Sequence, residues 1–191
     1  MRKVFIIGYN KTATTALDHL FKKSGYKTVH NDFGKLAIEI YNCVKEGKDP
    51  LGTYQKYDVF SDLIHSTPEW YLEANKYYKE IHSAYPNAYF IYNTRRTDKW
   101  ITSRFNHQWK GRRFFIEAMQ ALRQETENDL ERYWRTMKSD FERDVQYYFK
   151  DNENFLYFDT ENEPIETLIE FVKEDYTLNK DHWQRLNVTK G

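Results

Sequence analysis

One lysine and several threonines lie close together near the start of the chain, in the segment GYNKTATT at residues 8–15. The ammonium group of Lys11 can neutralise a phosphate or sulfate oxygen, and threonine hydroxyls can donate hydrogen bonds to the same anion. The β-branched and aromatic run at residues 4–7 predicts a short buried strand, and Gly8 permits a tight turn after it. From about Thr14, apolar residues recur at helical spacing, so the amides of a helix start should face the turn. This order predicts a phosphate-binding loop; an ordinary strand, turn and helix is the alternative.

The loop departs from the G-x-x-x-x-G-K-[ST] pattern of ATP-binding and GTP-binding loops, because position 13 is alanine and the only lysine comes before it. It instead resembles the 5′-phosphosulfate loop of the sulfotransferases, which is close to G-x-P-K-[ST]-G-T-T-x-L. The matching residues are Gly8, Lys11, Thr12, Thr14, Thr15 and Leu17. Asn10 replaces the usual proline and Ala13 the usual glycine. If position 13 requires a positive φ angle, its alanine costs on the order of 1 kcal/mol.

The resemblance implies that the chain binds 3′-phosphoadenosine 5′-phosphosulfate (PAPS) and transfers its sulfuryl group. In this interpretation the residues around the 5′ end of PAPS are Gly8, Tyr9, Asn10, Lys11, Thr12, Ala13, Thr14 and Thr15. The threonines would bind the 5′-phosphate through hydroxyls and helix-start amides. Lys11 would also be catalytic, because negative charge develops on the bridging and equatorial oxygens during transfer.

Residues 89–104, YFIYNTRRTDKWITSR, carry a second part of the resemblance. Sulfotransferases have a similar strand followed by an arginine and, eight residues later, a serine, and Arg95 and Ser103 keep that separation. The Lys-Trp pair between them resembles one found in bacterial-type members. The resemblance implies that Arg95 and Ser103 bind the 3′-phosphate, for which a bidentate guanidinium is well suited. Arg96 is the alternative, but side chains alternate along a strand and the spacing favours Arg95.

Two further positions resemble the family more loosely. Tyr157, in the predicted strand FLYFDT, stands where some members place a tyrosine against adenine. The final Lys190-Gly191 resembles the end of an Arg-Lys-Gly segment that cytosolic members use for the 3′-phosphate, and a frayed tail is the alternative.

Asp62 is the predicted catalytic base, because the sequence YDVFSD ends a strand at the edge where the loop and Arg95 should also lie. Related bacterial-type enzymes often have aspartate at the end of this strand. A turn or N-cap role before Ser66-Thr67-Pro68 is the alternative. His65 is the second candidate base, since its unperturbed pKa lies closer to neutrality.

The chain has 191 residues, of which 40% are hydrophobic, and this suffices for one domain over residues 1–191. It contains no signal peptide and no apolar stretch near about 18 residues, so we expect a soluble, cytoplasmic protein without a membrane span. The single cysteine, Cys43, excludes an intrachain disulfide. Net charge is zero, but residues 95–113 are basic and residues 159–175 acidic, which indicates a face for a polyanion.

Alternating patterns predict a doubly wound α/β fold, with a mainly parallel sheet of about five strands and helices on both faces, as in P-loop nucleotide kinases. The expected strands lie near 3–8, 27–30, 57–61, 88–94 and 154–159. The expected helices lie near 14–24, 34–47, 68–83, 98–106, 112–148 and 164–174. Whether 112–148 is one long helix or a broken pair stays open.

The resulting hypothesis is a sulfotransferase that moves a sulfuryl group from PAPS to a hydroxyl or amine of a small-molecule or glycan acceptor. No metal site is expected, because the histidines have no metal-ligand spacing. One alternative is a kinase that uses Mg-ATP, with Asp58 or Asp62 on the metal. Another is a non-catalytic nucleic-acid-binding module on the basic segment, with Trp100, Phe105 and Trp109 for stacking, although zero net charge disfavours nucleic acid.

Overall fold

A five-stranded parallel sheet in the order β2-β3-β1-β6-β7 forms the centre of the computed structural model, which describes residues 1–108, 111–123 and 126–184. Its strands are β1 (Val4–Ile6), β2 (Thr28–His30), β3 (Val59–Ser61), β6 (Tyr89–Thr94) and β7 (Phe155–Asp159). Phe5 of β1 stands opposite Phe60 of β3 on one side and Phe90 of β6 on the other. The predicted parallel sheet of five strands is confirmed.

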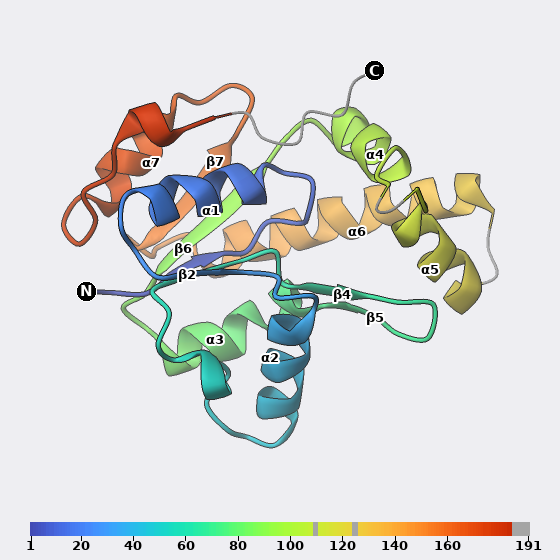
Figure 1. Cartoon of the computed structure of the whole chain (residues 1–191), viewed down its shortest axis with the longest axis horizontal. Coiled ribbons are helices and arrows are strands. Elements are labelled where there is room, and N and C mark those ends of the chain that lie inside the picture. The colour runs from blue at the N-terminus through green and yellow to red at the C-terminus, as the bar shows by residue number, and fades with distance from the viewer. Residues whose placement is uncertain (109–110, 124–125, 185–191) are drawn as a thin grey trace.

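Helices cover both faces of this sheet (Figure 1). α1 (Thr14–Lys23) and α7 (Ile165–Val172) lie on one face, and α2 (Lys35–Lys45), α3 (Tyr78–Ala84) and α6 (Glu127–Tyr148) lie on the other. α4 (Thr97–Phe105) and α5 (Phe114–Arg123) pack beside α6. Short 3₁₀ turns span Gly52–Tyr54, Ala74–Tyr77 and Lys180–His182. Among the described residues, no helix is both long enough and apolar enough to cross a membrane.

Both faces of the central strands are buried, and this explains their unbroken apolar sequences. Phe90 and Tyr92 of β6 join the core that Val145 of α6 also enters. Tyr89 and Ile91 alternate with them and join the opposite core, which packs under α1 and α7. The sheet is therefore held from both sides, and the ends of its strands are fixed in space.

The helix expected at 68–83 is wrong in its first part. Residues Ile64–Ser66 and Tyr71–Glu73 instead form an antiparallel hairpin, β4 and β5, and α3 begins only at Tyr78. Thr67 and Trp70 exchange backbone hydrogen bonds of 2.9 and 3.2 Å across the turn, with Pro68 inside it. Proline at the first central position of a tight turn and the pairing of Leu72 with His65 prevail over the helical spacing of the apolar residues.

The segment 112–148 is a broken pair of helices, α5 and α6. Thr126 begins α6 with a capping box, in which its hydroxyl accepts from the Asp129 amide and the Asp129 carboxylate accepts from the Thr126 amide. The pair packs with α4 around a core of its own that includes Trp100, Leu130 and Trp134. Tyr9 of the predicted loop also enters this core, so the α4–α6 layer supports the loop from one side.

Gly8 lies at the end of β1, where the chain passes closest to β6. Its amide donates a 2.9 Å hydrogen bond to Oδ1 of Asn93. A Cβ atom at this position would lie 2.0 Å from the carbonyl oxygen of Asn93 and 2.3 Å from Oδ1. Gly8 is absent from the residues with a positive φ angle, so close approach of two backbones, and not an unusual turn conformation, requires glycine here.

We expect Gly8→Ala to lower the free energy of unfolding by roughly 2–3 kcal/mol, because β6 must move to admit the methyl group. Urea unfolding followed by circular dichroism measures the change. Gly47→Ala is the matched control: its φ angle is 65° and no atom lies within 4 Å of the added methyl, so it should cost only about 1 kcal/mol. Equal losses in the two variants would contradict the close-approach explanation.

Candidate functional site

Five segments meet at the carboxyl ends of the parallel strands, where ligands bind in folds of this type. They are the loop 8–13 after β1, His30 at the end of β2, Asp62 after β3, Arg95 after β6 and Glu161 after β7. Strand order places the loop between the ends of β3 and β6. The sequence prediction that the loop, Asp62 and Arg95 follow strands of the same sheet agrees with this arrangement.

Asn93, the fifth residue of β6, holds the loop in place with its side-chain amide. The amide group is completely buried, and its Oδ1 accepts from the Gly8 amide. Its Nδ2 lies 2.7 Å from both the carbonyl oxygen and the hydroxyl of Thr12. The Thr12 hydroxyl in turn donates to the Tyr9 carbonyl oxygen. Thr12 is buried, and its side chain makes its hydrogen bonds inside the loop and to Asn93.

The side chains of Tyr9 and Asn10 also point into the protein. The Tyr9 ring packs 5.5 Å from Trp100 and 5.1 Å from Phe141, measured between ring centroids. The Asn10 Oδ1 accepts a 2.7 Å hydrogen bond from Arg104, and its carbonyl oxygen accepts one of 2.9 Å from the indole of Trp100. These two predicted contact residues anchor the loop, and we expect only their backbone near a nucleotide.

Arg104 is the centre of this anchoring network. Its side chain is completely buried, with Nη2 2.7 Å from Oε1 of Glu73 on the hairpin. The guanidinium carbon lies 4.3 Å from the Trp100 ring centroid and 5.1 Å from that of Trp134. A buried charge requires a paired partner, so Arg104 joins the loop, the β4–β5 hairpin and α4 into one unit.

The turn before α1 has the backbone geometry of an anion-binding nest. Lys11 and Ala13 have φ angles of 68° and 67°, in the left-handed region. α1 begins at Thr14 without a side-chain cap, and the amides of Ala13, Thr14 and Thr15 have no acceptor within the described residues. Successive free amides beside the positive end of a helix favour a bound anion.

The Lys11 side chain extends from the loop to the segment that follows α4. Its Nζ lies 3.1 Å from Nδ1 of His107, which follows α4. Burial lowers the pKa of the Lys11 ammonium group, and the nearby Asp62 carboxylate acts in the opposite direction. Burial and the charge of Lys11 lower the pKa of His107 to about 4, so its neutral ring accepts the hydrogen bond. His107 thus orients Lys11, a role that the sequence did not reveal.

Asp62 directly follows β3 and has a φ angle of 56°. Its Oδ2 is 3.6 Å from Nε2 of His30, and its buried Oδ1 has no hydrogen-bond partner in the described part of the chain. Burial raises the pKa of the Asp62 carboxyl, although the charges of His30 and Lys11 oppose this. A carboxylate with a raised pKa and a free oxygen is suited to accept a proton.

His30 connects this carboxylate to the loop. Its Nδ1 lies 2.8 Å from the Ser61 hydroxyl, and its Nε2 lies 3.3 Å from the Thr15 hydroxyl. The sequence pattern by itself indicates no role for His30. The available signal was its position at the end of a predicted strand, at the same edge as Asp62.

His65, the second predicted base, lies in β4 away from this cluster. Its ring centroid is 5.2 Å from that of Trp70, and it covers Gly34, where a Cβ atom would meet its Nδ1 at 2.5 Å. Among the described residues it has no hydrogen bond to Lys11 or Asp62. Burial lowers the pKa of the His65 ring. The geometry therefore favours Asp62 over His65 as the candidate base.

Arg95 extends along the far side of the loop. Its Nη1 donates to the Lys11 carbonyl oxygen at 3.4 Å, and its Nη2 lies 3.3 Å from Oε1 of Glu161. Its buried Nε has no partner in the described residues. Ser103 is half-buried on α4, and the described structure contains no hydrogen bond between Ser103 and Arg95. The prediction that both residues contact a 3′-phosphate stays a prediction.

Tyr157 lies on the sheet face that α6 covers. Its hydroxyl donates to Glu142 of α6, and its ring is 5.8 Å from that of Tyr92.

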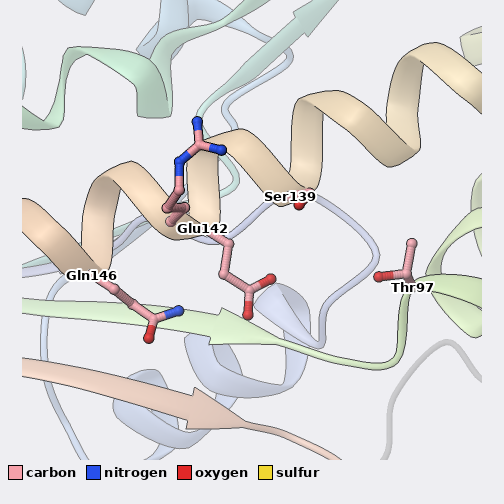
Figure 2. A pocket seen from close by; sticks show the side chains of 5 residues that line it. Thr97, Ser139, Glu142 and Gln146 are labelled. Atoms are coloured by element: carbon pink, nitrogen blue, oxygen red, sulfur yellow. The ribbon is translucent and has the colours of Figure 1, made fainter.

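Glu142 also lines a surface cavity of about 410 Å³ together with Thr97, Ser139, Arg143 and Gln146. Figure 2 shows Thr97 at the start of α4 across from side chains of α6. None of the predicted site residues lines this cavity, and Lys190-Gly191 lies outside the described residues.

Carboxylates neutralise most of the basic segment 95–113, which was expected to face a polyanion. Its described ion pairs are Arg95 and Lys99 with Glu161, Arg104 with Glu73, Arg112 with Glu117, and Arg113 with Glu127. Trp100 is completely buried, and Trp109 lies outside the described residues. These pairs reduce the positive field available to a nucleic acid. Among the described residues, no His, Cys, Asp and Glu side chains are grouped to hold a metal ion.

The fold is that of a P-loop-like α/β protein, with a loop of left-handed residues and free amides at the carboxyl edge of its sheet. The model of the sulfotransferase domain family matches residues 3–186, nearly the whole chain. The chain therefore belongs to the sulfotransferase domain family, and the resemblance inferred from the loop is confirmed. No curated protein is similar enough in sequence to count as a match.

We expect Ala13→Gly to raise the free energy of unfolding by about 1 kcal/mol, because glycine relieves the left-handed backbone at this position. Thermal or urea unfolding measures the gain. Ala16→Gly, inside α1, should instead lower the free energy of unfolding by about 1 kcal/mol. A loss of stability in Ala13→Gly would mean that the left-handed conformation carries no strain.

Proposed function

We propose that the protein transfers a sulfuryl group from PAPS to a hydroxyl or amine of an acceptor. The observation that carries this proposal is that Lys11, close enough to Asp62 for their charges to interact, lies in the same loop as the free amides before and at the start of α1. An anion nest, a cation and a proton acceptor are the groups that sulfuryl transfer requires. Membership of the sulfotransferase domain family supports the same reaction class.

The chemical fit to PAPS rests on two separate sets of donors. The amides of Ala13, Thr14 and Thr15, with Lys11, would bind the 5′-phosphosulfate, which carries negative charge at both phosphorus and sulfur. Arg95, whose buried Nε has no partner in the described structure, would bind the 3′-phosphate. Ser103 would join it there, and Tyr157 stays a prediction for the adenine.

The reaction balances without a covalent enzyme intermediate. The acceptor oxygen or nitrogen forms a bond to sulfur, and the bond between sulfur and the 5′-phosphate oxygen breaks. The proton of the acceptor passes to the Asp62 carboxylate, and adenosine 3′,5′-bisphosphate leaves. Lys11 stabilises the charge that grows on the departing oxygen. His107 holds the Lys11 ammonium group in place, and His30 holds the Asp62 carboxylate.

A strained turn beside Asp62 provides a wall for the acceptor. Asn31, Asp32 and Phe33 all have positive φ angles, and Asn31 Nδ2 holds the turn to the carbonyl oxygens of Asp62 and Ile64 at 3.1 and 2.6 Å. The turn leaves the Phe33 ring 84% exposed. An exposed ring on a strained turn at the rim of a site is suited to a sugar or phenol ring. We therefore propose a ring-bearing small molecule or glycan as the acceptor.

Calorimetric titration of the purified protein tests the donor. Adenosine 3′,5′-bisphosphate, 5′-AMP, and ATP with and without Mg²⁺ are compared directly. The proposal predicts micromolar binding of the bisphosphate and at least about tenfold weaker binding of the others, because only the bisphosphate fills both anion sites. Preference for Mg-ATP would favour a kinase instead, and no binding of any nucleotide would exclude both.

Lys11→Ala should lower turnover by roughly 10²–10³ with a smaller loss of nucleotide affinity, because its main contact strengthens as charge develops. Transfer of ³⁵S from labelled PAPS to a panel of phenols and sugars, and calorimetry with the bisphosphate, separate the two effects. Lys22→Ala, in the last turn of α1, is the control and should leave both unchanged. Unchanged turnover in Lys11→Ala would remove Lys11 from the chemistry.

A further inference from the structure

Glu161, in the turn after β7, lies where an anion bound to Arg95 would lie. Its Oε1 is 3.3 Å from Nη2 of Arg95 and 2.9 Å from Nζ of Lys99, and its Oε2 accepts a 3.1 Å hydrogen bond from the Arg96 amide. One carboxylate thus accepts from two cationic side chains and from the backbone at the start of α4. This is the donor set that a phosphate group would use.

The Glu161 side chain is ionised and largely enclosed. Only 16% of it is exposed, compared with 27% of Arg95 and 51% of Lys99. Burial by itself raises the pKa of the Glu161 carboxyl, but hydrogen bonds from Lys99 and the Arg96 amide, with the charge of Arg95, outweigh burial and lower it. The group is therefore a full negative charge near neutral pH.

The backbone of the turn is fixed independently of this side chain. The Thr160 amide and hydroxyl both donate to the Thr94 carbonyl oxygen, at 3.0 and 2.9 Å. The Glu161 amide donates to Oδ1 of Asp159 at 2.9 Å. Rotation of the Glu161 side chain can therefore release Arg95 and Lys99 without unfolding the turn.

We infer that Glu161 is an internal competitor for the 3′-phosphate of the nucleotide: it neutralises Arg95 and Lys99 in the free protein and is displaced when that phosphate binds. The inference rests on the proposed function. A dianionic phosphate and a carboxylate cannot share these donors without repulsion, so binding includes the displacement of Glu161. A nucleotide without a 3′-phosphate leaves the carboxylate in place. Glu161 thus lowers the affinity for PAPS and for the bisphosphate product alike, which favours product release.

The alternative is a positioning role, in which Glu161 only holds Arg95 in the orientation that phosphate needs. The two roles predict opposite changes in the affinity for the bisphosphate when Glu161 is replaced. Removal of a competitor strengthens binding of the bisphosphate, whereas removal of a positioning partner weakens it.

Calorimetry on Glu161→Gln tests the inference, with Glu163→Gln as the matched control. Glu163 lies in the same turn and has the same charge, but it has no ion pair with Arg95 or Lys99 among the described residues. We expect Glu161→Gln to bind adenosine 3′,5′-bisphosphate about tenfold more tightly and 5′-AMP within about twofold of the unsubstituted protein, because only the former meets the released cations. Glu163→Gln should stay within about twofold for both nucleotides.

A measurement on the unsubstituted protein covers the case in which Glu161→Gln does not fold. The Arg96 amide should show a large ¹H–¹⁵N shift on titration with the bisphosphate and little with 5′-AMP, since its acceptor changes from carboxylate to phosphate. Weaker bisphosphate binding by Glu161→Gln, equal tightening in both variants, or an unmoved Arg96 resonance would overturn the inference. Failure of the proposed function is distinct: neither the unsubstituted protein nor Glu161→Gln would then bind the bisphosphate.

Discussion

The buried side-chain amide of Asn93 connects the loop after β1 to the neighbouring strand β6, and the geometry of the site depends on this connection. It accepts from Gly8 and donates to Thr12, so both ends of the loop are held by one completely buried group. A buried polar group without partners is costly, which favours the one loop conformation that satisfies all three hydrogen bonds. Arg95 comes two residues later, directly after β6 ends at Thr94, and it contacts the Lys11 carbonyl oxygen.

A second buried network fixes the outer side of the loop. Arg104 joins Asn10 to Glu73 of the hairpin, between the rings of Trp100 and Trp134. Removal of one partner would leave a charge in an apolar environment, so the network specifies a single arrangement of loop, hairpin and α4. The loop can then tolerate the left-handed backbone at Ala13, because the surrounding contacts determine its path.

Lys11 and Arg95, the two cationic side chains at the loop, each contact another side chain of the protein. Lys11 donates to a neutral His107, and Arg95 is paired with Glu161. Both cations therefore have a partner within the protein, in a chain whose net charge is zero. Asp62 differs, because one of its oxygens has no partner in the described residues and its pKa is raised by burial. The proposed anion-binding groups and the proposed proton acceptor thus differ in their surroundings.

The sequence by itself determined the sheet and the loop. β-branched and aromatic runs predict all five strands, and the residues GYNKTATT predict an anion-binding turn, because these properties depend on neighbours along the chain. The position of Asp62 at the carboxyl edge also follows from the sequence, because Asp62 comes directly after a predicted strand. The roles of Asn93, Arg104, His30, His107 and Glu161 did not follow from it, and neither did the β4–β5 hairpin. Their partners lie between 15 and 96 residues away, so only the tertiary structure decides which polar groups meet. The sequence likewise could not show that side chains of Tyr9, Asn10 and Thr12 turn inward, because long-range hydrogen bonds and packing, and not local propensity, set their direction.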